Sequence, residues 1–153
     1  MDIKQMQGDV ASQEEGVWLQ YAEGDWKFKL AYGGTGSRAG DIYDRLLSKA
    51  RQRNRNTLWL PSEVTTPIQR DWLAAHIFKG WKNVTSDGKP LAFNKENLEA
   101  LLNVESIGAR VVEWAGIECR MIENFKNQTD ADVGSEEGSP ATAAMKSGSS
   151  LEP

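Results

Sequence analysis

Residues 66–102, TPIQRDWLAAHIFKGWKNVTSDGKPLAFNKENLEALL, combine the clearest helix-start signal of the chain with its densest apolar content. Thr66 can cap a helix, because Pro67 then falls at the first helical position and Gln69 can close a capping box. At 3.6 residues per turn, the apolar positions of this helix fall on two sides. One side carries Ile68, Trp72, Ala75 and His76, and the other carries Leu73, Ile77 and Trp81. We therefore expect a helix that needs cover on both sides and stops at Gly80.

A turn and a second helix follow in the same stretch. The run Ser86-Asp87-Gly88-Lys89 is typical of a tight turn. Asn94 is placed to cap a helix that carries Leu98, Leu101 and Leu102. The order predicted for residues 66–102 is helix, turn, short extended piece and helix.

Upstream, residues 17–32 show the alternation of a β-hairpin. Val17, Leu19 and Tyr21 alternate with their neighbours, a turn follows at Glu23-Gly24-Asp25, and alternation resumes from Trp26 to Tyr32. Since a lone hairpin is marginal in water, one face must pack on helices. The glycine-rich run 33–37 lacks the lysine of a phosphate-binding loop, so we interpret it as a flexible connector.

Two further helices complete the predicted α+β fold, a hairpin packed on about four helices. The first runs from Ser37 to about Asn54, with acids early and bases late. The second, over residues 104–125, should be the longest of the chain. Gly108 and Gly116 interrupt it, so close packing or a bend is expected at one of them.

Charge and composition divide the chain into three parts. We expect a mobile arm over 1–15, a single domain over 16–126 and a disordered acidic tail over 127–153. The tail holds one Lys and five acids, so residues 1–126 carry 17 basic and 17 acidic residues. This balance gives no general nucleic-acid signal. No apolar run is long enough for a membrane span and no export leader is evident.

The residues that could support chemistry form no catalytic pattern. The chain has one histidine and one cysteine, which excludes an intrachain disulfide and a zinc site of the usual kind. His76 has no identifiable nucleophile beside it, and Cys119 fits a small core residue. We therefore predict no enzyme, no cofactor and no metal site.

Aromatic residues on the predicted helices exceed what three or four helices need for a core. Each could simply be buried, but the set also fits a hydrophobic groove that receives an amphipathic helix of another protein. The candidate partner-binding residues are Trp72, Trp81, Trp114, Ile117, Met121 and Phe125.

Residues 15–128 resemble tail assembly chaperones of long-tailed, siphovirus-type bacteriophages. The resemblance starts with EGVWLQY, WKFKLAY and the basic helix DIYDRLLSKARQR, and continues through AAHIFKGWKNVTSDGKPLAFNKENLEALL to a terminal ENFKN. It implies a non-enzymatic chaperone in the host cell cytoplasm that binds the tape measure protein and promotes tail tube assembly. Contact with the tail tube protein, homo-oligomerisation and a longer frameshifted product are further possibilities for such a family.

Two other functions remain open from the sequence. The basic segment from Arg45 to Arg55 could serve a small RNA-binding regulatory protein, although no aromatic residue interleaves its charges. The chain could also be a structural virion component, such as a tail completion or head–tail joining protein.

Overall fold

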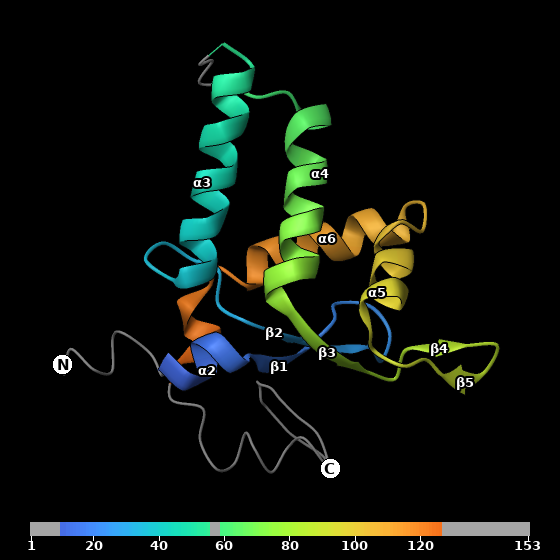
Figure 1. Cartoon of the computed structure of the whole chain (residues 1–153). Coiled ribbons are helices and arrows are strands. Elements are labelled where there is room, and N and C mark those ends of the chain that lie inside the picture. The colour runs from blue at the N-terminus through green and yellow to red at the C-terminus, as the bar shows by residue number, and fades with distance from the viewer. Residues whose placement is uncertain (1–9, 56–58, 127–153) are drawn as a thin grey trace.

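A computed structural model describes residues 10–55 and 59–126, and it places a small antiparallel sheet against one end of a group of helices (Figure 1). The main sheet has the order β1-β2-β3, formed by Val17–Gln20, Lys27–Leu30 and Phe78–Lys82. A two-stranded ribbon pairs β4 (Thr85–Ser86) with β5 (Lys89–Pro90). The helices are α2 (Val10–Glu15), α3 (Arg38–Arg53), α4 (Ser62–Trp72), α5 (Lys95–Leu102) and α6 (Ile107–Glu118), with a π-helical segment η1 (Leu73–Ile77) and a 3₁₀ turn η2 (Ile122–Phe125). This architecture confirms the predicted α+β class.

The predicted hairpin is confirmed as β1 and β2. Val17 lies opposite Leu30, and Leu19 lies opposite Phe28. Phe28 and Leu30 have no exposed surface, whereas the alternate residues of β2 are partly exposed. One face of the hairpin is therefore sealed against the core, as the alternation predicts.

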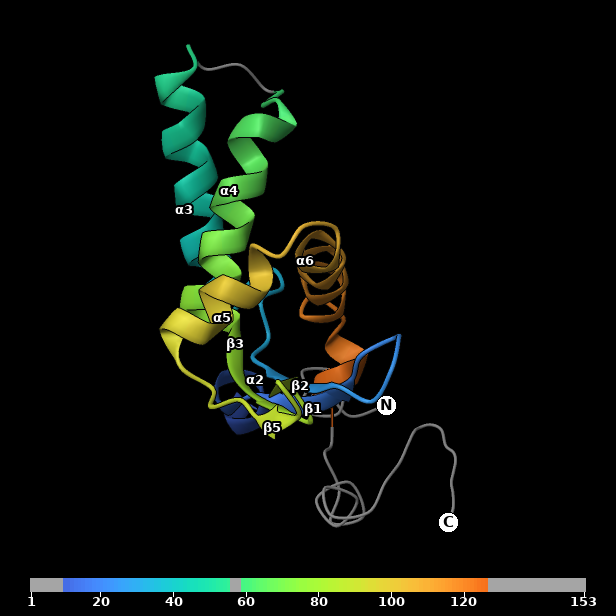
Figure 2. The same cartoon turned by 90° about the vertical axis from the view of Figure 1, so that its right-hand side faces the viewer.

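The helix predicted from Thr66 begins earlier than expected. It starts at Ser62, directly after Pro61, whose carbonyl accepts hydrogen bonds from the amides of Val64 and Thr65 at 2.9 and 3.1 Å. Pro67 consequently lies inside α4, where it lacks the N–H for one helical hydrogen bond. Packing compensates for this loss, because α4 lies along α3 in both views (Figures 1 and 2).

The same helix also ends earlier, so the predicted stop at Gly80 is wrong. After η1 the backbone becomes extended at Phe78, and Phe78–Lys82 form β3 beside β2. Phe28 lies opposite Trp81, and the amide of Ala31 donates to the carbonyl of Ile77 at 2.8 Å. This pairing gives β2 a second neighbour and turns a marginal hairpin into a three-stranded sheet. Trp81 is thus a strand residue.

Three local predictions are confirmed. The helix predicted from Ser37 to about Asn54 is α3, and the Ser37 hydroxyl accepts a 2.9 Å hydrogen bond from the amide of Gly40 at its start. The Asn94 side chain accepts one of 2.8 Å from the amide of Asn97 at the start of α5. Asp87 and Gly88 both have positive φ, as a tight two-residue hairpin turn requires.

The long helix predicted over residues 104–125 is instead α6 followed by η2. Residues 103–106 form a loop in which Ser106 adopts a φ of 63°, and α6 ends at Glu118. The Asn124 side chain donates to the Glu118 carbonyl at 3.0 Å, which satisfies part of the helix end. Within the described residues, α3 with 16 residues is the longest helix.

Aromatic rings join the sheet to α6. Trp114 on α6 lies edge-on to Tyr21, with ring centroids 5.2 Å apart, and 5.7 Å from Phe28. Phe28 also meets Phe78 at 5.4 Å. Such ring pairs add to the stabilisation from buried area, so the sheet holds α6 in a fixed position.

The predicted arm over residues 1–15 is described only in its second part. Periodicity did not indicate α2, which occupies residues 10–15 of the predicted arm. The rest of that arm, residues 1–9, and the predicted tail at 127–153 lie outside the described residues. Among the described residues, no helix has both the length and the apolar character needed to span a bilayer.

Candidate partner-binding groove

A groove of about 560 Å³ lies between α4, the loop after α5 and α6. We call it the α4–α6 groove. It is lined by Thr66, Gln69 and Arg70 of α4, by Leu102, Asn103, Val104, Glu105 and Ser106, and by Ala109, Val112, Glu113, Gly116, Ile117 and Arg120. Two helices and a loop therefore line this space.

The apolar residues of the groove divide into buried and exposed members. Leu102 and Val112 are buried, whereas Val104 is 45% and Ile117 56% exposed. The described part of the chain exposes five large apolar side chains, and four of them lie between residues 104 and 121. Two of these four, Val104 and Ile117, line the groove, and exposed apolar residues at a groove are typical of a binding surface.

Gly116 of α6 faces the side chain of Gln69 on α4 within the groove. A Cβ at this position would collide with the side-chain amide of Gln69 on α4. The Gly116 carbonyl accepts a short hydrogen bond from the Arg120 guanidinium. The close packing predicted for one of the two helix glycines is confirmed here and at Gly108, where a Cβ would meet the Leu102 carbonyl.

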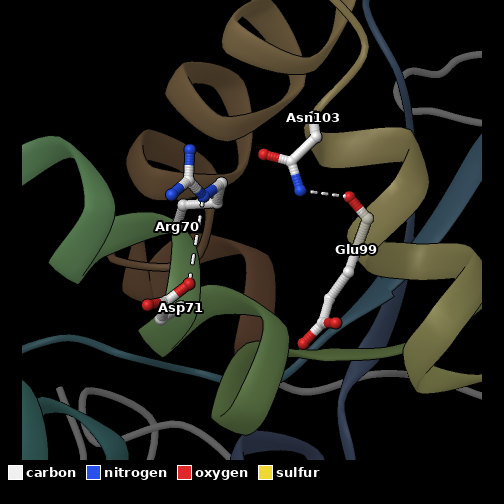
Figure 3. A network of polar contacts seen from close by, with 4 residues as sticks. All are labelled: Arg70, Asp71, Glu99 and Asn103. Atoms are coloured by element: carbon white, nitrogen blue, oxygen red, sulfur yellow. Dashed lines mark hydrogen bonds and ion pairs between the residues drawn. The ribbon is translucent and has the colours of Figure 1, made fainter.

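Charges of both signs lie at the edges of the groove. The Arg70 Nε lies 3.9 Å from Asp71, a long ion pair, and the Asn103 side chain donates to the Glu99 carbonyl at 2.7 Å (Figure 3). Arg120 is exposed, and its guanidinium carbon lies 5.1 Å from the Tyr43 ring of α3 and 5.2 Å from the Trp72 ring of α4. Because Glu105 and Glu113 add negative charge, the groove suits an apolar stripe with polar flanks.

Comparison with known proteins identifies the origin of the chain. A family model described as YdaY prophage protein matches residues 36–135. The chain belongs to the YdaY prophage protein family. All residues that line the groove of this prophage protein fall within the matched span. No curated protein and no solved structure matches the chain.

The structure separates the six predicted partner-binding residues into two groups. Trp72, Trp81 and Phe125 are 1%, 8% and 0% exposed, so the expectation that they lie around an open surface is wrong. Trp72 donates from its indole N–H to the Ala39 carbonyl at 2.8 Å, and Trp81 to the Leu91 carbonyl at 2.7 Å. Both indoles thus have the internal partner that a buried tryptophan needs, and both belong to the core of the YdaY-family fold.

The remaining three predicted residues lie on or beside α6. Trp114 is partly buried against the sheet, while Ile117 and Met121 are exposed, and Ile117 lines the groove. Sequence reasoning missed Val104 and Ile107 as surface residues, because both fit the apolar stripe of the longer predicted helix. The loop at 103–106 removes Val104 from that stripe.

Trp59 is a further exposed residue that the sequence did not indicate. It is 89% exposed and does not line the groove. It lies two residues before Pro61, the residue that precedes α4, and no local pattern marks it as exposed.

Cys119 and His76, the residues that the sequence offered for chemistry, lie within the packed fold. Cys119 is buried, as predicted, and burial raises the pKa of its thiol to about 11. His76 is partly exposed in η1, and burial together with the nearby Lys79 and Arg38 charges lowers its pKa.

Gly33 and Gly34 are buried, and the amide of Gly33 donates to the Cys119 carbonyl at 2.8 Å. The connector at 33–37 therefore packs tightly at its start. Within the described residues, no three His, Cys, Asp or Glu side chains cluster as a metal site requires.

Proposed function

We propose that this prophage protein is a tail assembly chaperone whose α4–α6 groove binds helical segments of the tape measure protein. The observation that carries the proposal is that two exposed apolar side chains, Ile117 and Val104, line the groove. An amphipathic helix laid in an apolar groove is a recurring mode of protein recognition. The phage origin of the family and the resemblance of residues 15–128 to tail assembly chaperones both support this role.

The proposed role is non-enzymatic. The chaperone would shield apolar faces of the partner in the host cytoplasm until tail tube subunits assemble around it. Ile117 and Val104 would contact the apolar stripe of the bound helix, while Arg70 and Glu113 would face its polar flanks. Binding of this kind depends mainly on the buried apolar anchors, since charges at the rim contribute little affinity.

Co-expression with the tape measure protein of the same prophage, followed by affinity capture, tests the proposal. Ile117→Glu places a charge in the groove and should abolish capture. Trp59→Glu is the matched control, because Trp59 is more exposed than Ile117 and lies outside the groove. Circular dichroism should show that both variants remain folded. Equal capture by the two variants would exclude the groove as the binding site.

A structural virion component would behave differently in a second experiment. Mass spectrometry of purified particles should detect no stoichiometric amount of this protein if it acts as a chaperone. Stoichiometric recovery with the particles would contradict the chaperone role.

A further inference from the structure

The outer face of the main sheet is basic, and it lies opposite the face that packs on the core. Strand register places Lys27 opposite Lys82 and Trp18 opposite Lys29. The neighbouring residues Val17, Phe28 and Trp81 point into the core. We call Trp18, Lys27, Lys29 and Lys82 the basic sheet face.

Two features indicate that this face is suited to an anionic ligand. Lys27 and Lys82 form a directly opposed pair of like charges, an arrangement that destabilises a sheet. Among the described residues, no carboxylate lies within ion-pair distance of Lys27 or Lys29. An acidic segment bound here would gain charge–charge attraction to these lysines.

Trp18 extends across the strands of this face. The Lys82 Nζ lies 4.3 Å and the Lys29 Nζ 6.0 Å from the centre of its ring. The far edge of the indole reaches the backbone at Gly80, where a Cβ would lie 3.4 Å from Trp18 Cη2. The indole therefore holds two ammonium groups near one another on the sheet.

We propose that the acidic segment 127–153 of the same chain docks on the basic sheet face. This segment carries Asp130, Asp132, Glu136, Glu137 and Glu152 against a single lysine, and four of these acids fall within eight residues that contain no base. Residues 1–126 carry equal numbers of acidic and basic side chains, so the segment holds the net charge of the whole protein. Complementary charge thus singles out segment 127–153 as the occupant.

The chain leaves the described region close enough to the sheet for this contact. The ring of Phe125 in η2 lies 5.2 Å from that of Tyr32, and η2 is beside the sheet in Figure 2. Tyr32 follows β2 and is three residues from Lys29, roughly 10 Å along an extended chain. Glu137 is twelve residues beyond Phe125 and can therefore extend up to roughly 40 Å. Lys27 is five residues from Tyr32, roughly 17 Å along an extended strand, so Glu136 and Glu137 can reach the lysines of β2.

Paramagnetic relaxation in the full-length protein tests the docking. A nitroxide attached at Ser139→Cys labels one site selectively, because Cys119 is fully buried. At low salt, the Trp18 indole N–H and the backbone amides of Lys27 and Lys29 should lose most of their NMR intensity. Amides of the exposed residues of α5 should keep theirs. High salt should restore the lost signals, since it screens exposed charges.

A second labelled variant provides the matched control and changes none of the described residues. It carries Asp130→Asn, Asp132→Asn, Glu136→Gln and Glu137→Gln and should restore the signals of the basic sheet face at low salt. The proposal is overturned if the face keeps full intensity at low salt or if the neutralised variant still broadens it. It is also overturned if a single-stranded oligothymidylate shifts the Trp18 signal equally in both variants, because the face would then be a nucleic-acid site that the segment does not occupy.

Discussion

Trp72→Phe should destabilise the fold, because Trp72 joins α3 to α4 from inside the core. Its indole N–H donates to the Ala39 carbonyl, and its ring lies 4.6 Å from that of Tyr43. Phenylalanine retains an aromatic ring but has no N–H and occupies less volume. The variant thus removes one hydrogen bond and leaves a void between the two helices.

The expected loss follows from these two contributions. A hydrogen bond of this kind is worth about 1 kcal/mol net. A void at least as large as a methyl group in the core costs about 1 kcal/mol more. Trp72→Phe should therefore lower the free energy of unfolding by about 2 kcal/mol.

Urea unfolding followed by far-UV circular dichroism measures this difference. The midpoint should fall while the slope of free energy against urea stays the same, since the surface exposed on unfolding hardly changes. Trp59→Phe is the matched control, and it should stay within about 0.5 kcal/mol of the parent protein because Trp59 is exposed. If Trp72→Phe were as stable as Trp59→Phe, the structural role assigned to Trp72 would be refuted.

Two further predictions concern α6 and the cysteine at its end. Gly108→Ala should destabilise the fold by about 1 kcal/mol or more, because its Cβ meets the backbone carbonyl of Leu102. Gly116→Ala should be nearly neutral, since only the flexible end of the Gln69 side chain must move. Urea unfolding midpoints of the two variants test this difference, and equal midpoints would contradict it. The Cys119 pKa is raised from 9.0 to about 11, so the unfolded chain ionises first, and stability should be unaffected below pH 9 and fall by about 2 to 3 kcal/mol between pH 9 and 11. Unfolding curves of Cys119→Ala across this range isolate the contribution, and a parallel pH dependence in both proteins would refute it.

Local chemistry made several elements predictable from the sequence. Ser37 and Asn94 cap their helices through hydrogen bonds to amides three residues ahead, so the signal and the structure lie within one turn. The turn at Asp87-Gly88 depends only on residues that tolerate positive φ. Alternation in β1 and β2 was equally local, because each strand buries one face.

The elements that failed depend on contacts between distant segments. Leu73, Ile77 and Trp81 satisfy a helical period, yet Trp81 pairs with Phe28 more than 50 residues away, and no periodicity reports that pairing. The burial of Phe125 arises in the same way from packing near Tyr32. The aromatic content relative to the number of helices suggested a binding surface. Only the fold shows that four of the exposed large apolar residues lie on or next to α6 in the chain.

Site-specific photocrosslinking during co-expression with the tape measure protein tests the central claim most directly. A photoreactive amino acid is placed at position 117 in one sample and at position 59 in another, both of which are exposed in the folded protein. A chaperone that binds through the α4–α6 groove should crosslink to a helical segment of the tape measure protein from position 117 and not from position 59. Crosslinks to that protein from position 59 alone, or from neither position, would contradict the account.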